Sequence, residues 1–432
     1  MKRKLILGPM LVLGLYMVAN AANAGPRTAG AEIIGSQRTV LQDGIVHYTF
    51  DVDLGPDEFD VIRLHRIVRE RRPNRPVATV SGVFLLPGSP NFFEQIFMEP
   101  LISTVPDWDQ SVVVFLAKND IDVWGMDYAW ALVPLETTDF GFMQGWGLER
   151  EIHYAEQGIA TARAIRVATG RGNRRLHLLG FSYGVPLAYG IANNETLLPP
   201  GQRQIKGLIP VDYEMKVDNE TQRLAACALA EDEQALIDSG TYQDDTGVFF
   251  FTVGYLAETA PDDVSPFVPL FTNWQFALFV GAFHDPWHFV GGEFDESGIP
   301  TGLRFTDPEL WVDLAQAGSY YVPLQAYVDM DTTMCDEVDV PFDDHLGEIT
   351  IPILAVGAAG GASPDHYTAS LTATEDYEEF TVQLLSNDEY MLDFGHADLF
   401  TATDAEALVW QPILDWILAH RANRTYPPPN NR

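Results

Sequence analysis

The sequence predicts an α/β fold with a mostly parallel, doubly wound sheet and a large, mainly helical cap inserted between two of its strands. Three observations lead to this prediction. Short apolar runs alternate with helical stretches, a pattern that favours parallel strands joined by right-handed crossovers. The alternation stops for the 138 residues 213–350 and then resumes. A Gly-x-Ser-x-Gly segment lies between one apolar run and the helical stretch after it.

The N-terminus has the features of a secretory signal peptide. A basic start, Lys2-Arg3-Lys4, precedes the apolar stretch 5–18, and Ala22-Asn23-Ala24 is a small-x-small cleavage site. The apolar stretch is shorter than the ~20 residues that span a bilayer, so we expect no stable membrane insertion. We therefore expect residues 1–24 to be removed and the protein to be periplasmic or extracellular.

The chain is strongly acidic. Among its 432 residues, Asp and Glu number 61 and Lys and Arg number 26, a formal net charge of −35. Removing residues 1–24, which carry three positive charges, makes this −38. Such a chain repels polyphosphate, which argues against nucleic acid as a partner. The charge favours either a salt-rich habitat or acidic drift in an ordinary secreted protein.

The elements of the core follow in order along the chain. The early β-prone run 78–86 ends in Pro87-Gly88-Ser89-Pro90, a turn typical of a functional loop at the carboxyl end of a buried strand. The other predicted strands are 45–52, 61–68, 121–128, 175–179, 205–211, 351–357 and 380–385. The predicted helices are 108–118, 148–169, 185–192 and 405–422. These boundaries divide the mature chain into a core, 25–212 and 351–432, and a cap, 213–350, long enough to act as a lid.

The segment Gly180-Phe181-Ser182-Tyr183-Gly184 carries the strongest chemical signal. A serine on a tight strand-to-helix turn is held in a strained conformation with its Oγ exposed, and the two glycines remove side chains that would collide there. The N-terminus of the next helix points N–H groups toward the same place. We therefore expect Ser182 to be a nucleophile.

A nucleophilic serine needs a base, and His396 is the candidate among the ten histidines. His396 lies between the last predicted strand and the last predicted helix, in a loop that opens at the carboxyl edge of the sheet, where Ser182 also lies. His284 and His288 have the i, i+4 spacing of a metal pair, but Pro286 argues against a continuous helix there. We expect neither a metal nor another cofactor.

The strand–helix alternation, the turn at Ser182 and the late His396 resemble the α/β-hydrolase superfamily over residues ~30–212 and ~351–422, with the cap outside the resemblance. The segment Gly395-His396-Ala397-Asp398 and the helix after it resemble secreted bacterial lipase- and esterase-like members. The resemblance implies a serine esterase with a Ser-His-acid triad, in which Ser182 attacks the carbonyl carbon and His396 transfers the proton.

The resemblance leaves two candidates for the acid. In the family it most often follows the strand equivalent to 351–356, where Asp365 is the first carboxylate. In some members it follows the strand next to the nucleophile's strand, where Asp212 lies, and loop position favours Asp212 over Asp365. The family's oxyanion hole implies backbone N–H groups from Tyr183 and Ser89, although the His-Gly start common in that loop is absent here.

The cap is rich in aromatic residues, with 13 between 249 and 294. They suit an apolar lid over the serine, or a core that the cap needs for its own stability, and different rings can serve each purpose. Cys227 and Cys335 both fall in the cap, either as a disulfide or as two packed thiols.

These observations predict a secreted serine hydrolase that cleaves small-molecule carboxylic esters with apolar acyl or aromatic groups. Two alternatives use the same fold. One is a peptidase or lactonase on the same triad, and the other is a catalytically silent protein that binds an apolar ligand.

Overall fold

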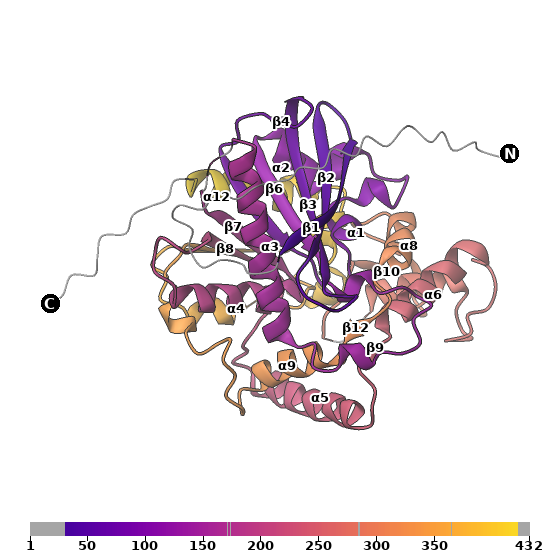
Figure 1. The fold of residues 1–432 in the computed structure, drawn as a ribbon. Helices are drawn as coiled ribbons and strands as arrows, with labels where there is room; N and C mark the ends of the chain where they lie inside the picture. The colour runs from indigo at the N-terminus through magenta and orange to yellow at the C-terminus, as the bar shows by residue number, and fades with distance from the viewer. Residues whose placement is uncertain (1–30, 171, 173, 284–285, 364, 422–432) are drawn as a thin grey trace.

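A ten-stranded sheet runs through the molecule, with helices on both faces (Figure 1). The computed structural model describes residues 31–170, 172, 174–283, 286–363 and 365–421. The expected signal peptide, 1–24, lies outside the described residues. No helix in the described ranges is long and apolar enough to cross a membrane.

The sheet combines an antiparallel edge with a parallel main part, in the order β1-β2-β3-β6-β5-β7-β8-β13-β14. The strands from β6 to β14 are parallel to one another, and β1, β2 and β3 pair antiparallel beside them, which confirms the predicted mostly parallel sheet. The tenth strand, β4, pairs with β3. In chain order the strands are β1 (Glu32–Val40), β2 (Ile45–Asp53), β3 (Val61–Arg72), β4 (Arg75–Pro76), β5 (Ser81–Leu86), β6 (Ile121–Asp127), β7 (Leu176–Phe181), β8 (Ile205–Val211), β13 (Ile353–Ala358) and β14 (Tyr377–Val382).

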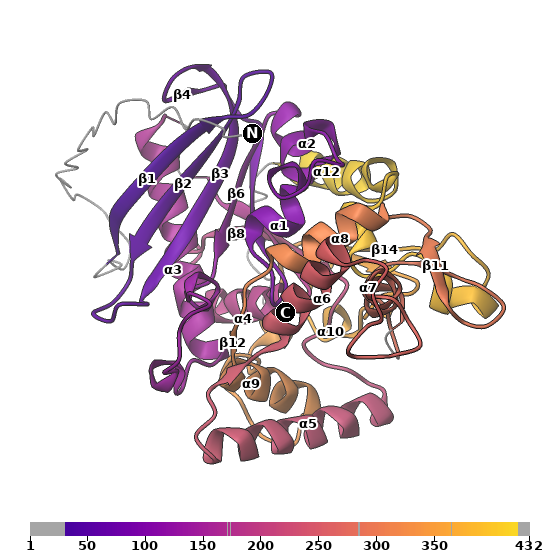
Figure 2. The same ribbon diagram turned by 90° about the vertical axis from the view of Figure 1, so that its right-hand side faces the viewer.

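Both faces of the parallel strands are buried, except at the edge strand β14, and alternate residues of one strand enter different cores. In β5, Phe84 and Leu86 pack with α3 and α4, whereas Val83 and Leu85 pack with α2 and α12. Strands buried on both faces read as continuous apolar runs, which is why the sequence revealed them. Figures 1 and 2 show the sheet between the two helix layers. The covering helices are α2 (Val112–Lys118), α3 (Leu148–Ala168), α4 (Gly184–Thr196) and α12 (Gln411–Ala419).

The predicted position of two late elements was inexact. The strand expected at 380–385 lies three residues earlier, at β14, because this edge strand exposes most of its side chains and has no continuous apolar run. The helix expected at 405–422 begins with a π-helical turn, Glu406–Trp410, before α12. Pro412 has no N–H to donate, which disfavours regular α-helical bonding at this junction.

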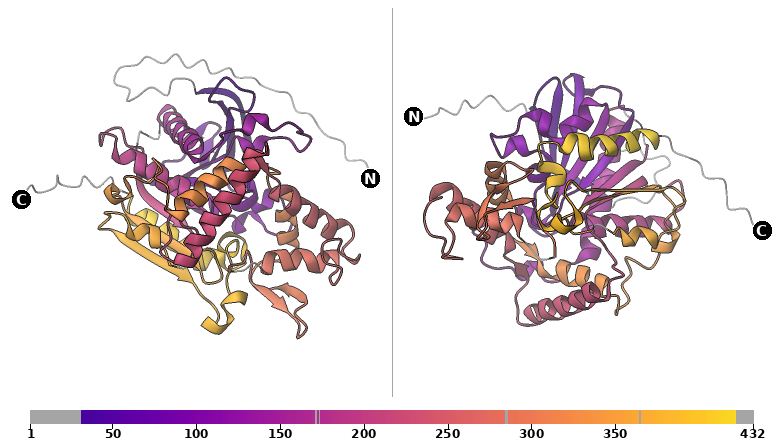
Figure 3. Two further views of the ribbon diagram at one scale, coloured as in Figure 1. Left: turned by 90° about the horizontal axis from the view of Figure 1, so that it is seen from below. Right: turned by 180° about the vertical axis from the view of Figure 1, so that it is seen from behind.

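Between β8 and β13, in the predicted cap segment, the described residues form five α-helices and four short strands (Figure 3). In one group, the helices α6, α7 and α8 pack against one another, with Val253, Phe271 and Phe276 in the core that they form. The other group is α5 against α9, and Figure 2 shows α5 on the outer side of α9. The elements are α5 (Glu220–Asp238), β9 (Gln243–Asp244), α6 (Thr246–Thr259), α7 (Asn273–Ala282), β10 (Gly292–Phe294), β11 (Pro300–Leu303), α8 (Pro308–Ala317), β12 (Val322–Pro323) and α9 (Leu324–Cys335).

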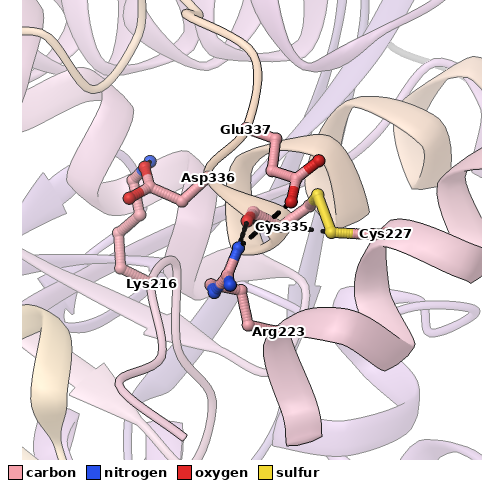
Figure 4. The surroundings of a disulfide bond; sticks show 6 residues. All are labelled: Lys216, Arg223, Cys227, Cys335, Asp336 and Glu337. Atoms are coloured by element: carbon pink, nitrogen blue, oxygen red, sulfur yellow. Dashed lines mark hydrogen bonds and ion pairs between the residues drawn. A yellow bond between two sulfur atoms is a disulfide. The ribbon is translucent and has the colours of Figure 1, made fainter. Parts of the chain in front are cut away.

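The two cysteines form a disulfide that joins α5 to the C-terminal end of α9 (Figure 4). Beside it, Arg223 of α5 donates to the carbonyl oxygen of Cys335 at 3.2 Å and pairs with Glu337. Apart from such links α5 is weakly embedded, since Ala226 is its one buried residue. Of the two interpretations left open by the sequence, the structure shows the disulfide.

Candidate active site

Ser182 lies at the end of β7, on the turn that leads into α4, with a φ of +54°. L-residues seldom adopt this left-handed conformation, so neighbouring contacts must hold it. The Ser182 N–H donates to the carbonyl oxygen of Val211 at 3.1 Å. A Cβ at Gly180 would lie 2.2 Å from the carbonyl oxygen of Gly184. One at Gly184 would lie 2.4 Å from the carbonyl oxygen of Leu86. Both glycines are therefore required by the close approach of backbone.

His396 and Asp212 form a buried hydrogen-bonded pair in which His396 Nδ1 lies 2.6 Å from Asp212 Oδ2. Asp212 directly follows β8, the strand next to β7, and His396 lies in the loop before the short helix α11 (Asp398–Thr401). The His396 N–H donates to the carbonyl oxygen of His288 at 3.0 Å, which fixes the loop. Since β7 and β8 are parallel, their carboxyl ends bring Ser182 and Asp212 to one edge of the sheet.

Backbone N–H groups surround the Asp212 carboxylate. Oδ1 accepts from Ala358 at 3.1 Å and Ser363 at 3.3 Å, and Oδ2 accepts from Ala362 at 3.0 Å. Burial would raise the pKa of Asp212, but the hydrogen bond and charge of His396, with these N–H donors, outweigh it and lower the pKa. Asp212 therefore stays ionised and accepts the Nδ1–H of His396.

The other carboxylates considered as the acid lie in different surroundings. Asp365 is exposed, at the turn before the short helix α10 (Tyr367–Ser370). The Glu214 carboxylate accepts from Ser363 Oγ and from the N–H of Thr368 at 2.8 Å. Asp393 accepts from three backbone N–H groups, those of Leu384, Leu385 and Phe394, and so ties its own loop together.

The expected oxyanion donors lie on the two turns that flank the serine. Tyr183 is the residue after Ser182, and Ser89 belongs to the loop after β5, whose Gly88 packs so closely that a Cβ there would lie 2.8 Å from Ser182 Cβ. Among the hydrogen bonds of the described residues, neither Tyr183 N nor Ser89 N is a donor. The Ser89 hydroxyl lies 2.6 Å from the hydroxyl of Tyr327, a residue of α9.

A cavity of about 200 Å³ opens over Ser182 and His396. Among the described residues that line it there is no Asp, Glu, Lys or Arg. The aromatic lining comes from both parts of the chain: Phe181, Tyr183, Tyr213, Phe250, Trp287, Phe289, Trp311 and Tyr327. Of the 13 aromatic residues between 249 and 294, Phe250, Trp287 and Phe289 line the cavity, whereas Phe271 and Phe276 are buried in the cap's own core. Some of these rings thus line the cavity and others form the core of the inserted segment, as expected.

Aromatic rings also hold the imidazole of His396. The ring of Phe181 stacks on it at a centroid distance of 4.5 Å, and the ring of Trp287 lies 5.1 Å away at a tilt. His288, considered above for a metal pair, is buried with Nε2 2.7 Å from the carbonyl oxygen of Asp393, and His284 lies outside the described residues.

Sequence reasoning missed Tyr327 and Tyr213 as residues of this cavity. Tyr213 follows Asp212 directly, so its place at the strand end was a usable signal. Tyr327 offered none, because helical periodicity does not say which ring of an inserted helix reaches a loop of the core.

The strand order, the turn at Ser182 and the loop that carries His396 define the α/β-hydrolase fold, which confirms the fold expected from the sequence. Over 90% of its length the chain is similar to the crystal structure of a putative lipase from Sulfolobus solfataricus, of which 98% is covered, at a TM-score of 0.60 and 17% sequence identity. It is also similar to juvenile hormone epoxide hydrolase from the silkworm Bombyx mori, with 88% and 80% of the two chains covered, a TM-score of 0.43 and 12% identity. No protein-family model and no curated protein matches the sequence.

Proposed function

We propose that this protein is a secreted serine hydrolase that cleaves carboxylic esters with apolar acyl or aromatic groups. The observation that carries the proposal is the 2.6 Å contact between Asp212 and His396, which lines one cavity together with Ser182 on its strained turn. A nucleophile, a base and an oriented acid are the three parts that acyl transfer needs.

In the proposed reaction, Ser182 Oγ attacks the ester carbonyl carbon and His396 Nε2 takes the hydroxyl proton. Asp212 holds the proton on Nδ1 and stabilises the imidazolium that forms. The negative charge moves to the carbonyl oxygen, where the N–H groups of Tyr183 and Ser89 stabilise it. The intermediate then expels the alcohol, which receives the proton from His396. Water, with His396 again as base, hydrolyses the acyl-enzyme and restores Ser182.

The lining of the cavity supports an uncharged substrate. An exopeptidase would require a carboxylate to bind the substrate's amine, and the described lining residues include none. Rings such as Phe250 and Trp311 instead offer apolar surface to an acyl chain or an aromatic group. Secretion is supported by the signal-peptide features of residues 1–24.

The proposal is tested by labelling the purified protein with a fluorophosphonate, mapping the labelled peptide and measuring p-nitrophenyl ester hydrolysis. We expect label on Ser182 and loss of turnover on the order of 10⁶ in Ser182→Ala, without loss of the fold. Ser239→Ala, which changes an exposed serine of the cap, serves as the matched control and should keep full activity. A folded Ser182→Ala protein with near wild-type turnover would refute the mechanism. An unlabelled and inactive wild-type protein would favour the silent binding protein.

A further inference from the structure

A second group of chemically able side chains lies outside the cavity, between the antiparallel edge of the sheet and the short helix α1 (Phe93–Phe97). His47 of β2 and His65 of β3 are buried, with 4% and 0% of their surfaces exposed. Their rings approach each other with His47 Nε2 3.0 Å from His65 Nδ1. Glu94 of α1 completes the group, with Oε1 3.8 Å from His47 Nδ1 and 3.9 Å from His65 Nδ1.

The imidazole of His65 is oriented by a carboxylate on its far side. His65 Nε2 lies 3.0 Å from Asp127 Oδ2, at the end of β6, and Asp127 Oδ1 accepts the N–H of Phe93 at 2.7 Å. The ring of Phe93 stacks on His65 at 4.5 Å. With Nε2–H donated to Asp127, the Nδ1 lone pair of His65 faces His47 and Glu94. Metal-binding histidines typically have this arrangement, in which a carboxylate fixes the tautomer and the ring.

The spacing of the three residues fits a first-row divalent cation. Each offers one ligand atom, and these atoms lie within 4.8 Å of one another. Tetrahedral Zn²⁺ with bonds of about 2.0–2.1 Å separates its ligand atoms by about 3.3 Å. His47 Nε2 lies 3.0 Å from His65 Nδ1, and Glu94 Oε1 lies 3.9 Å from the same Nδ1, so these two separations fall on either side of that value. A small movement of the part-exposed Glu94 side chain toward the two imidazoles would close the site.

The charges around the group favour a cation. Glu94 and Asp127 face one guanidinium, that of Arg63, which already pairs with Asp51 at 2.8 Å. His47 is buried, which disfavours a charged imidazole, and the neutral imidazole is the form that binds metal. The Glu94 side chain is 39% exposed, which gives an ion a path from solvent and leaves a position for water.

We propose that His47, His65 and Glu94 form a binding site for Zn²⁺ or a similar divalent transition metal, with Asp127 as the residue that positions His65. On binding, the metal replaces the proton shared between the two imidazoles, and that proton moves to the other nitrogen of His47. The site is distinct from the hydrolase cavity but joined to it through α1, because Gln95 and Ile96 of that helix line the cavity. No short sequence motif predicts this site, because its three residues lie on separate elements, two strands and a helix.

The test uses the purified protein with a tag that contains no histidine, stripped with a chelator and titrated with Zn²⁺ and with Co²⁺. We expect one equivalent of Zn²⁺ to bind, a rise in Tm, and the visible absorption of tetrahedral Co²⁺. Glu94→Gln and His47→Gln should each lose the absorption and at least tenfold in affinity. Glu94→Gln changes a part-exposed side chain and should fold even if His47→Gln does not.

The control is His345→Gln, which alters a part-exposed histidine whose Nδ1 lies 3.0 Å from Glu348 Oε1, a surface pair of similar chemistry. This variant should bind Zn²⁺ as the wild type does. The proposal is overturned if the wild type binds no Zn²⁺ at micromolar free concentration, or if folded Glu94→Gln keeps the Co²⁺ spectrum. Either result leaves the group as a hydrogen-bonded histidine pair only. Both readouts are independent of ester hydrolysis.

Discussion

Replacing Asp212 with asparagine removes a charge and also forces a choice between two amide orientations. If the NH₂ group occupies the position of Oδ2, it faces His396 Nδ1 and the N–H of Ala362. If it occupies the position of Oδ1, it faces the N–H groups of Ala358 and Ser363. Each buried N–H left without an acceptor costs about 1–3 kcal/mol. The first orientation leaves one such group and the second leaves two, so the first is favoured by about 1–3 kcal/mol.

The favoured orientation makes the amide donate to His396 Nδ1, which moves the imidazole proton to Nε2. A protonated Nε2 does not accept the proton of Ser182, so we expect Asp212→Asn to lose about 10⁴ in turnover, as in the serine-protease template. The assay is p-nitrophenyl ester turnover, with circular dichroism to show that the variant folds. Asp365→Asn, which changes an exposed carboxylate, is the control and should keep most activity. Turnover of folded Asp212→Asn within tenfold of wild type would refute the assignment of the acid.

Three further predictions follow from other contacts. Gly361→Ala should lower both turnover and Tm, because a Cβ there would lie 2.1 Å from Asp212 Oδ2; unchanged kinetics would show that the loop has room to move. In ~1 M NaCl, where the Debye length is about 3 Å, Tm should be higher than at low salt, since carboxylate repulsion is screened; a flat or falling Tm contradicts this. Burial raises the pKa of Glu233 to about 8 and that of Asp331 to about 7. In the folded protein these carboxyl groups therefore keep protons that they lose near pH 4 in the unfolded chain. Because of this difference, the free energy of unfolding falls as the pH rises from about 4 to 8. Glu233→Gln should therefore raise Tm by about 2 °C at pH 8 and have little effect at pH 5. Equal shifts in Tm at both pH values would argue against a raised pKa at Glu233.

The local sequence was sufficient to predict those features whose geometry a single segment determines. The turn at Ser182 depends on backbone contacts made by Gly180 and Gly184, which the sequence states directly. Strands such as β8 are buried on both faces and therefore appear as apolar runs. By contrast, β1 exposes most of its residues and carries little of this signal, so the sequence did not reveal it as a separate strand.

The site needed information that a one-dimensional pattern does not contain. Asp212 and His396 are 184 residues apart, and their contact depends on the parallel pairing of β8 with β13 and on the return of the loop after β14. The sequence could rank Asp212 above Asp365 by strand position but could not supply a distance. The catalytic roles of these residues stay a prediction for the variants above to test.

The disulfide between Cys227 and Cys335 makes the outermost helix depend on the redox state of its surroundings. With Ala226 as its one buried residue, α5 has little apolar contact to keep it on α9 once the bond is reduced. The sheet and its two cores do not depend on this bond. In a chain made in a reducing compartment, we therefore expect the sheet and the site at Ser182 to form with α5 loosely attached, and proteases to cut first in the segment 213–240.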